Sequence, residues 1–248
     1  MKKLLVSLVI SILLAAYPAW GKQSIDFYKL GLESSLFNKK IHYFSKALEL
    51  NPGLAVAYEK RGTLYYFQER YREMLLDFRR FTTLKPSDPE GFSMLGLAQL
   101  KMGNFSEAII KLSRAIELDP QLASAYLYRG EAYFRKGLLE LALEDSTKAI
   151  HLGKAQATIG RAYTIRSKVY RQLGQEGLAD EDFSQAYLLD PENYAYRYFT
   201  ITNYLASFVS DSNYVGSKGI SRLGLIGIIV LLFVLIFKLA LPSPRKGD

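Results

Sequence analysis

Residues 89–122 read PEGFSMLGLAQLKMGNFSEAIIKLSRAIELDPQL, and this stretch decides the fold. Small residues stand at Gly96 and Ala108, and Gly103 lies between them. Two helices can approach closely at Gly96 and Ala108, because glycine has no Cβ and alanine carries nothing beyond it. Gly103 suits the left-handed backbone that often follows a helix, and Pro120 prevents the second helix from continuing. The stretch therefore predicts two closely packed antiparallel helices.

The same pattern recurs along the chain with a period of about 34 residues. Pro52, Pro86 and Pro120 are evenly spaced by this period, and Pro191 follows after two further periods and a small insertion. The structural positions of the repeat are Gly62, Gly96, Gly130, Ala108, Ala142, Pro52, Pro86, Pro120 and Pro191. A pattern of this length and kind resembles the tetratricopeptide repeat, W-x2-L-G-x2-Y…A-x3-F…P. The resemblance implies an all-α chain that forms a right-handed α-solenoid of about five helical hairpins.

The repeats are expected to fill residues 22–208. The five hairpins are expected at about residues 21–54, 55–88, 89–122, 123–156 and 160–193. Three extra residues near Gln156 to Ile159 are expected to lengthen the loop before the fifth hairpin. The first hairpin has Tyr28 in the glycine column and Lys40 in the small-residue column, so its packing is expected to be looser. A capping helix over residues 194–208 would cover the open end, because each repeat buries its faces only against its neighbours.

The N-terminal segment, residues 1–21, is interpreted as a secretory signal peptide. Lys2 and Lys3 precede an apolar run that ends at Ala16, and a small-x-small triplet ends at Gly21. As a helix the apolar run would be about 20 Å long, too short for a bilayer core of about 30 Å. An uncleaved anchor is the alternative.

The C-terminal part is interpreted as a membrane anchor. Residues 209–219 form a short linker, residues 220–241 a transmembrane helix, and residues 242–248 a short basic tail. The apolar run is about 28 Å long as a helix, enough to cross. A buried core helix and a removable sorting or lipid-anchor signal are the alternatives.

The net charge of +8 comes mainly from the two ends, which leaves residues 22–217 nearly neutral. This distribution does not favour nucleic-acid binding, which needs a basic face on the folded domain. Positively charged short flanks stay on the cytoplasmic side of a membrane, while long domains cross it. We therefore predict a single-pass membrane protein whose repeats lie on the outer side, in a periplasm or an organelle lumen.

Catalytic chemistry is not expected. The chain has no cysteine, which excludes disulfides and thiolate ligands, and its two histidines, His42 and His151, are too far apart in a repeat stack to share a site. The acidic pairs at Glu144-Asp145 and in residues 180–182 are interpreted as solvated helix faces. We predict no enzyme activity, no catalytic residues, no cofactor and no metal site.

A binding groove is the predicted functional feature. The resemblance implies that an extended peptide or a helix lies in a concave groove lined by the first helix of each hairpin. The candidate groove residues are Tyr66, Ser93, Leu97, Leu127, Tyr128, Glu131, Arg135, Arg161, Lys168 and Arg171. Their composition favours a protein ligand with apolar anchors and an acidic segment. The carboxylate clamp known in one subgroup of the family is mostly missing, because Ser93, Tyr128 and Arg161 stand at its positions.

The leading hypothesis is therefore a non-catalytic, membrane-anchored scaffold or adaptor that binds a partner protein in its groove. Two alternatives stay open. The first is a structural protein that self-assembles into a homo-oligomer, and the second is a regulatory or assembly subunit of a membrane complex.

Overall fold

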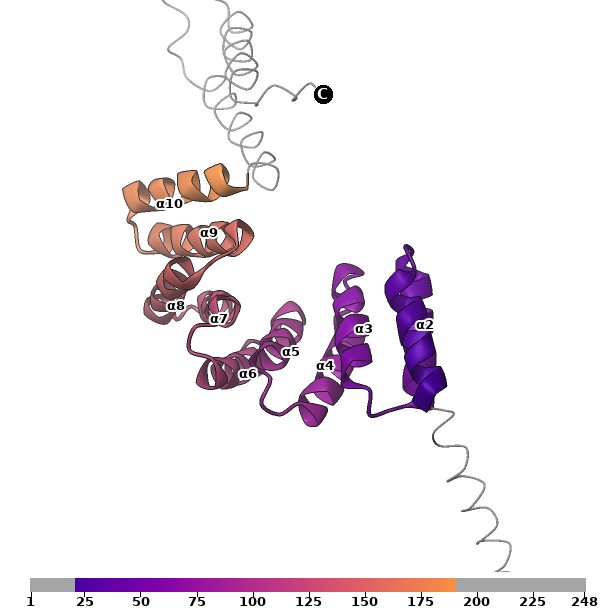
Figure 1. The fold of residues 1–248 in the computed structure, drawn as a ribbon. Helices are drawn as coiled ribbons and strands as arrows, with labels where there is room; N and C mark the ends of the chain where they lie inside the picture. Colours follow the sequence, from indigo (N-terminus) through magenta and orange to yellow (C-terminus); the bar gives the residue numbers. More distant parts are fainter. Residues whose placement is uncertain (1–20, 191–248) are drawn as a thin grey trace, which may run out of the picture. The chain divides into compact units, whose positions relative to one another are not determined.

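The computed structural model describes residues 21–190, and these residues form helices joined by short turns, without a strand (Figure 1). Among them, no helix is both long and apolar enough to cross a membrane. The predicted signal peptide, capping helix, linker, transmembrane helix and basic tail lie outside the described residues.

The helices follow each other in the order of the sequence. Residues 21–33 are helical and precede the other helices. The helices after them are α2 (Phe37–Leu50), α3 (Ala55–Phe67), α4 (Tyr71–Leu84), α5 (Pro89–Lys101), α6 (Phe105–Leu118), α7 (Ala123–Arg135), α8 (Leu139–Leu152), α9 (Gln156–Gln172) and α10 (Glu176–Leu189).

Consecutive helices pair into five hairpins, numbered here from 1 to 5. Hairpin 1 joins residues 21–33 to α2, and hairpins 2 to 5 begin with α3, α5, α7 and α9. Each helix packs against the next, and α7 also contacts both α5 and α9. Within the described part, the second helices of the hairpins (α4, α6, α8 and α10) make no comparable contact with one another. The first helices therefore lie on the inner side of the stack. The prediction of an all-helical repeat solenoid is confirmed for this part of the chain.

The glycine columns bring the two helices of a hairpin together, as predicted. A Cβ on Gly96 would lie 2.5 Å from Leu112 Cγ, and one on Gly62 would lie 2.8 Å from Phe78 Cε2. Ala108 is fully buried on the facing helix. A side chain at either glycine would overlap a core residue, so the small residues are a packing requirement.

The first hairpin packs more closely than the sequence predicts. Phe44 is 2% exposed, and Gly31 lies against its ring. Tyr28, expected in the glycine column, instead contacts the Phe44 ring with 5.6 Å between centroids. Gly31, about one helical turn later, therefore allows the close approach, and the expectation of loose packing is wrong.

The three extra residues before hairpin 5 lengthen a helix and not a loop. Helix α9 begins at Gln156 and contains 17 residues, whereas α7 contains 13. Lys154 stands two residues before α9, where the other repeats have proline. The predicted loop extension is therefore wrong.

The turn within each of hairpins 2 to 5 contains one residue with left-handed backbone geometry. Gly103, Gly137 and Gly174 have φ values of 81°, 76° and 74°, as expected for glycine after a helix. In hairpin 2 the same position is Glu69, with φ of 58°. This conformation costs an L-residue about 1–2 kcal/mol.

Replacing Glu69 with glycine is expected to stabilise the protein by about 1 kcal/mol, because glycine adopts the left-handed backbone without strain. Part of this gain is lost, because glycine also makes the unfolded chain more flexible. Urea denaturation followed by circular dichroism measures the change. Glu69→Ala is the control, because it removes the same carboxylate but keeps a Cβ. An equal gain from both variants would mean that the carboxylate and not the backbone is responsible.

Candidate functional site

Arginines on three of the first helices, those of hairpins 2, 4 and 5, bond their own hairpin to the one before it. In hairpin 4, Arg129 donates from Nε and Nη2 to the Asp145 carboxylate, at 2.7 and 2.9 Å. Its Nη1 donates to Ser113 Oγ at 3.0 Å. One side chain on α7 therefore bonds α8 of its own hairpin and α6 of the preceding hairpin.

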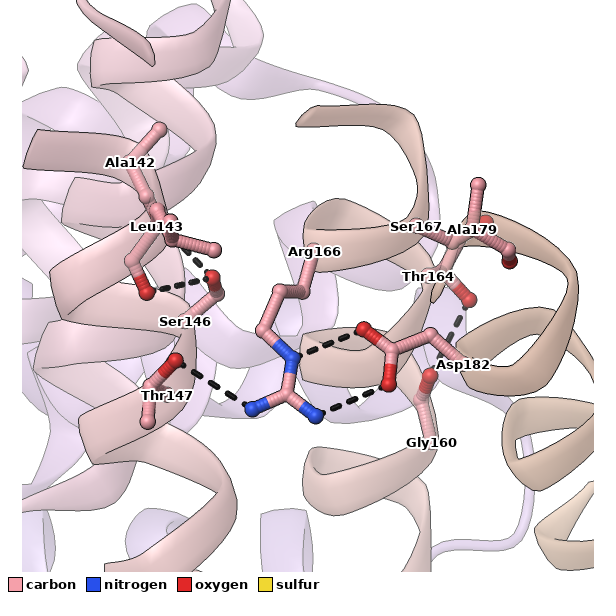
Figure 2. A network of polar contacts seen from close by, with 10 residues as sticks. All are labelled: Ala142, Leu143, Ser146, Thr147, Gly160, Thr164, Arg166, Ser167, Ala179 and Asp182. Atoms are coloured by element: carbon pink, nitrogen blue, oxygen red, sulfur yellow. Dashed lines mark hydrogen bonds and ion pairs between the residues drawn. The ribbon is translucent and has the colours of Figure 1, made fainter. Parts of the chain in front are cut away.

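The same arrangement recurs in hairpins 2 and 5. Figure 2 shows Arg166 between Asp182, at 2.7 and 2.8 Å, and Thr147, at 3.2 Å. Arg61 bonds Asp77 in the same two-pronged way, and Ser45 of hairpin 1 accepts its third bond. We call these sets the Arg–Asp–hydroxyl ties.

Tyrosine rings flank each guanidinium of the ties. The Arg129 guanidinium lies 5.7 Å from the centroid of Tyr126 and 5.6 Å from that of Tyr133. Arg61 and Arg166 have the same two neighbours, three residues before and four after. Each arginine is thus held by a carboxylate, a hydroxyl and two aromatic rings, which combines charge, hydrogen bonding and cation–π attraction.

Two acidic residues of these ties correct the sequence analysis. Asp145 and Asp182 are 3% and 4% exposed, so they are not part of solvated faces. Sequence reasoning missed them, although a signal was available. In each tie the arginine stands in the pattern Tyr-x2-Arg-x3-Tyr, and the aspartate follows the arginine by 16 residues.

The pKa shifts of the charged groups agree with a structural role for the Arg–Asp–hydroxyl ties. Hydrogen bonding to Asp182 raises the pKa of Arg166, against the opposing effect of its burial. Burial raises the pKa of Asp145, and the hydrogen bonds and charge of Arg129 act in the opposite direction. The arginines therefore stay charged, and each oxygen of their carboxylate partners accepts a hydrogen bond.

Hairpin 3 lacks the tie. Leu95 stands at the arginine position, Lys111 at the aspartate position and Arg79 at the hydroxyl position. Leu95 is 5% exposed and belongs to the apolar core. The junction between hairpins 2 and 3 is therefore apolar at the place where the others are polar.

The predicted groove contains one cluster of candidate residues in direct contact. The guanidinium of Arg161 on α9 lies 5.3 Å from the centroid of the Tyr128 ring on α7. The same group lies 3.5 Å from Glu131 Oε2. The side chains of Arg161 and Glu131 are 36% and 23% exposed, so both reach solvent. We call Tyr128, Glu131 and Arg161 the inner-face cluster.

The Tyr128 hydroxyl keeps its proton at neutral pH. Burial raises the pKa of Tyr128, and the positive charge of Arg161 opposes this rise without cancelling it. A neutral phenol both donates and accepts hydrogen bonds, and the neighbouring guanidinium only donates. The inner-face cluster therefore offers donors to an acidic or carbonyl-rich ligand.

Three candidate residues of the groove belong to the core instead. Ser93, Leu97 and Leu127 are 2%, 1% and 1% exposed. Leu97 is buried in the core cluster against which Tyr66 and Tyr128 also pack. The side chains of Ser93, Leu97 and Leu127 are thus not presented to a ligand, because helical periodicity gives the face of a side chain but not its depth.

The remaining candidates are not gathered into one basic end. Arg135 lies over the Phe105 ring at 5.1 Å, next to the turn of hairpin 3. Arg171 is bonded to Glu176 and Asp180, at 3.2 and 3.0 Å. Lys168 is exposed on α9, and Tyr66 is half-buried. Local acidic partners therefore neutralise part of the positive charge expected near hairpin 5.

No metal site was found in the described residues 21–190, which contain no group of three or more His, Cys, Asp or Glu side chains that could hold an ion.

Fold and repeat chemistry together define an α-solenoid of tetratricopeptide type. Residues 100–137 match a family model described as TPR repeat, and residues 160–193 match one described as tetratricopeptide repeat. The chain therefore carries tetratricopeptide repeats. Such repeats mediate protein–protein interactions, and their fold is generally non-catalytic.

Several relatives share the repeats over part of their length. Tetratricopeptide repeat protein 13 of Homo sapiens is 30% identical over 158 residues, 62% of this chain and 18% of the relative. The Hsp70-Hsp90 organizing protein of Triticum aestivum is 27% identical over 156 residues, 63% of this chain and 24% of the relative. The chain thus covers less than a third of either relative.

Solved structures share the fold. A crystal structure of MamA protein superposes with a TM-score of 0.59 at 23% identity, covering 71% of this chain and 96% of MamA. YrrB, described as a TPR protein with an unusual peptide-binding site, has a TM-score of 0.50 at 24% identity, covering 63% of this chain and 79% of YrrB. At these identities the likeness concerns the fold alone.

Proposed function

We propose that the protein is a non-catalytic, membrane-anchored scaffold that holds a peptide or helix of a partner protein along its first helices. The inner-face cluster carries this proposal. It gathers an aromatic ring, a carboxylate and a guanidinium from two neighbouring first helices, and both charged groups reach solvent. Aromatic and arginine side chains contribute strongly at protein interfaces.

The ion pair in this cluster suggests how a ligand binds. Arg161 and Glu131 are 3.5 Å apart, which is longer than the 2.7 Å contact between Arg129 and Asp145. A carboxylate of the partner would take the place of Glu131 beside Arg161, and the Tyr128 hydroxyl would donate to the same ligand. A partner segment with an acidic residue next to an apolar one fits this chemistry.

Relatives give the proposal further support. One is the Hsp70-Hsp90 organizing protein, and another is a co-chaperone of Cryptococcus neoformans with tetratricopeptide repeats and a J domain. Both names describe repeat-containing proteins that act together with other proteins. Membrane attachment rests on the apolar segment within residues 220–241, and the outer location rests on the charged flanks.

The double replacement of Tyr128 and Arg161 by alanine is expected to weaken partner binding by about 30-fold or more, because each removes a large contact of the kind that dominates interface energy. Photo-crosslinking in native membranes, from a benzophenone amino acid next to the cluster at Ser124, identifies the partner. Titration of that partner then measures the loss.

The control replaces Arg114 on α6, whose guanidinium pairs with the exposed Glu117 in the next turn. Arg114→Ala is expected to leave binding unchanged. Full-strength binding by the double variant, with its helical content intact, would contradict the proposed groove.

A further inference from the structure

The turns within neighbouring hairpins lie side by side. The rings of Phe37 and Phe67, 30 residues apart, have 6.1 Å between centroids, and Gln68 donates to the Asn38 side chain in the same place. The same 30-residue spacing joins Arg135 to Phe105, and Lys136 donates to Ser106 Oγ at 3.0 Å. These contacts join the turn of hairpin 1 to that of hairpin 2 and the turn of hairpin 3 to that of hairpin 4, and we call the edge formed by these four turns the turn edge.

Large apolar side chains gather at one end of the turn edge. Phe67 is 62% exposed, Leu36 58%, Leu32 48% and Phe37 46%. Single exposed apolar residues are ordinary, but these four lie in or beside two adjacent turns, and two of them touch. A gathered apolar surface of this kind marks an interaction site.

Basic side chains replace the apolar ones along the rest of the turn edge. The position of Phe67 becomes Lys101 in hairpin 3 and Arg135 in hairpin 4, and Lys136 follows Arg135. All three side chains are exposed. The turns at residues 101–105 and 135–139 contain no acidic residue, and the three cations outnumber Glu107 and Glu140, which follow in the first turns of α6 and α8.

The opposite edge of the stack, made of the loops between hairpins, has a different character. Residues 51–54, 85–88 and 119–122 contain no large apolar side chain that is exposed. Asp88 and Asp119 carry negative charge there, and Lys85 offsets one of the two. Among the described residues, the turn edge therefore carries exposed aromatic rings in hairpins 1 and 2 and exposed cations in hairpins 3 and 4, where Glu107 lies near Lys136.

We propose that the turn edge of hairpins 1 to 4 rests on an anionic lipid surface. Phe37, Phe67 and Leu36 enter the boundary between headgroups and acyl chains, and the cations of hairpins 3 and 4 lie over the lipid phosphates. Apolar and basic side chains on one face are the combination that holds proteins at membrane interfaces. The inference rests on the proposed membrane anchoring, because a short linker at residues 209–219 would keep the repeats near the bilayer.

Contact of the turn edge with the lipid would fix the orientation of the scaffold relative to the membrane. With the turn edge on the lipid, the first helices run from the opposite edge down toward the membrane, so their inner face stands beside the bilayer and stays open to solvent. A partner would then reach the inner-face cluster from the side and not from the membrane.

The absence of cysteine from the sequence makes a direct test available. Ser35→Cys places one thiol in the exposed turn of hairpin 1, and Ser87→Cys places one in the exposed loop between α4 and α5, on the opposite edge. The full chain, labelled with bimane at either site, is reconstituted into vesicles of phosphatidylcholine and phosphatidylglycerol that carry a nitroxide lipid. We expect quenching at position 35 to exceed quenching at position 87 at least threefold.

Two comparisons complete the test. Adding Phe37→Ser and Phe67→Ser to the Ser35→Cys chain is expected to remove at least half of the quenching, and vesicles of phosphatidylcholine alone are expected to give less. Equal quenching at both sites overturns the proposal. Lipid-independent self-quenching at position 35 also overturns it, in favour of contact between two copies.

Flotation of the same vesicles separates this proposal from the membrane anchor. A chain that floats with the vesicles while its label at position 35 is unquenched keeps its anchor but loses the lipid-bound edge. A chain that does not float loses both.

Discussion

Replacing Asp145 with alanine is expected to lower the free energy of unfolding by about 3 kcal/mol. The variant leaves the Arg129 guanidinium, whose side chain is 19% exposed, without its carboxylate between α7 and α8. Breaking a buried ion pair from one side costs about 3–5 kcal/mol, and the lower end applies because Arg129 retains Ser113 and some access to water. Urea denaturation of the full chain, followed by far-ultraviolet circular dichroism, measures the loss.

Hairpin 3 supplies the design of the control. Its apolar Leu95 shows that the stack accepts leucine at the arginine position. The double variant Arg129→Leu/Asp145→Ala is therefore expected to be more stable than Asp145→Ala by about 1 kcal/mol or more, because no unpaired charge remains. If the double variant is the less stable of the two, the unpaired arginine is not the cause of the loss.

Replacing Phe78 with alanine is expected to destabilise the protein by about 3–5 kcal/mol. Phe78 is 1% exposed and fills the space against Gly62, so the truncation leaves a cavity that neither helix can close without moving. The same denaturation experiment measures the effect. Hydrogen exchange of α3 and α4 shows whether the loss is confined to hairpin 2.

Phe67→Ala is the matched control, with the same chemical change on the same hairpin. Phe67 is 62% exposed, so its loss is expected to cost about 0.5 kcal/mol or less. Similar losses from both variants would show that burial against Gly62 is not what makes Phe78 important.

The sequence predicts the fold well because the repeat constrains small residues strictly. Gly96 and Ala108 stand where a larger side chain would overlap its neighbour, and Gly103 stands where φ is positive. These requirements are local and recur from one repeat to the next, so they can be recognised without coordinates. The close packing of the first hairpin could not be predicted in this way, because Gly31 contacts Phe44 about one helical turn after the position that the period predicts.

The candidate site was less predictable because its residues depend on depth and on cross-hairpin contacts. Leu97 and Tyr128 are both on the inner face of the first helices, yet Leu97 is 1% exposed and Tyr128 is half-buried beside Arg161. A helical period does not distinguish these two cases. Asp145 was misread for a related reason, since its partner Arg129 lies 16 residues away and becomes visible only when the repeats are aligned.

The ties also set how the stack responds to temperature. Three junctions between hairpins are joined by an arginine, and the junction between hairpins 2 and 3 has Leu95 in its place. Apolar burial weakens on cooling, and the desolvation cost of an ion pair falls on warming. At this position the apolar junction and the three polar junctions therefore change strength in the same sense, so cooling weakens all four junctions together.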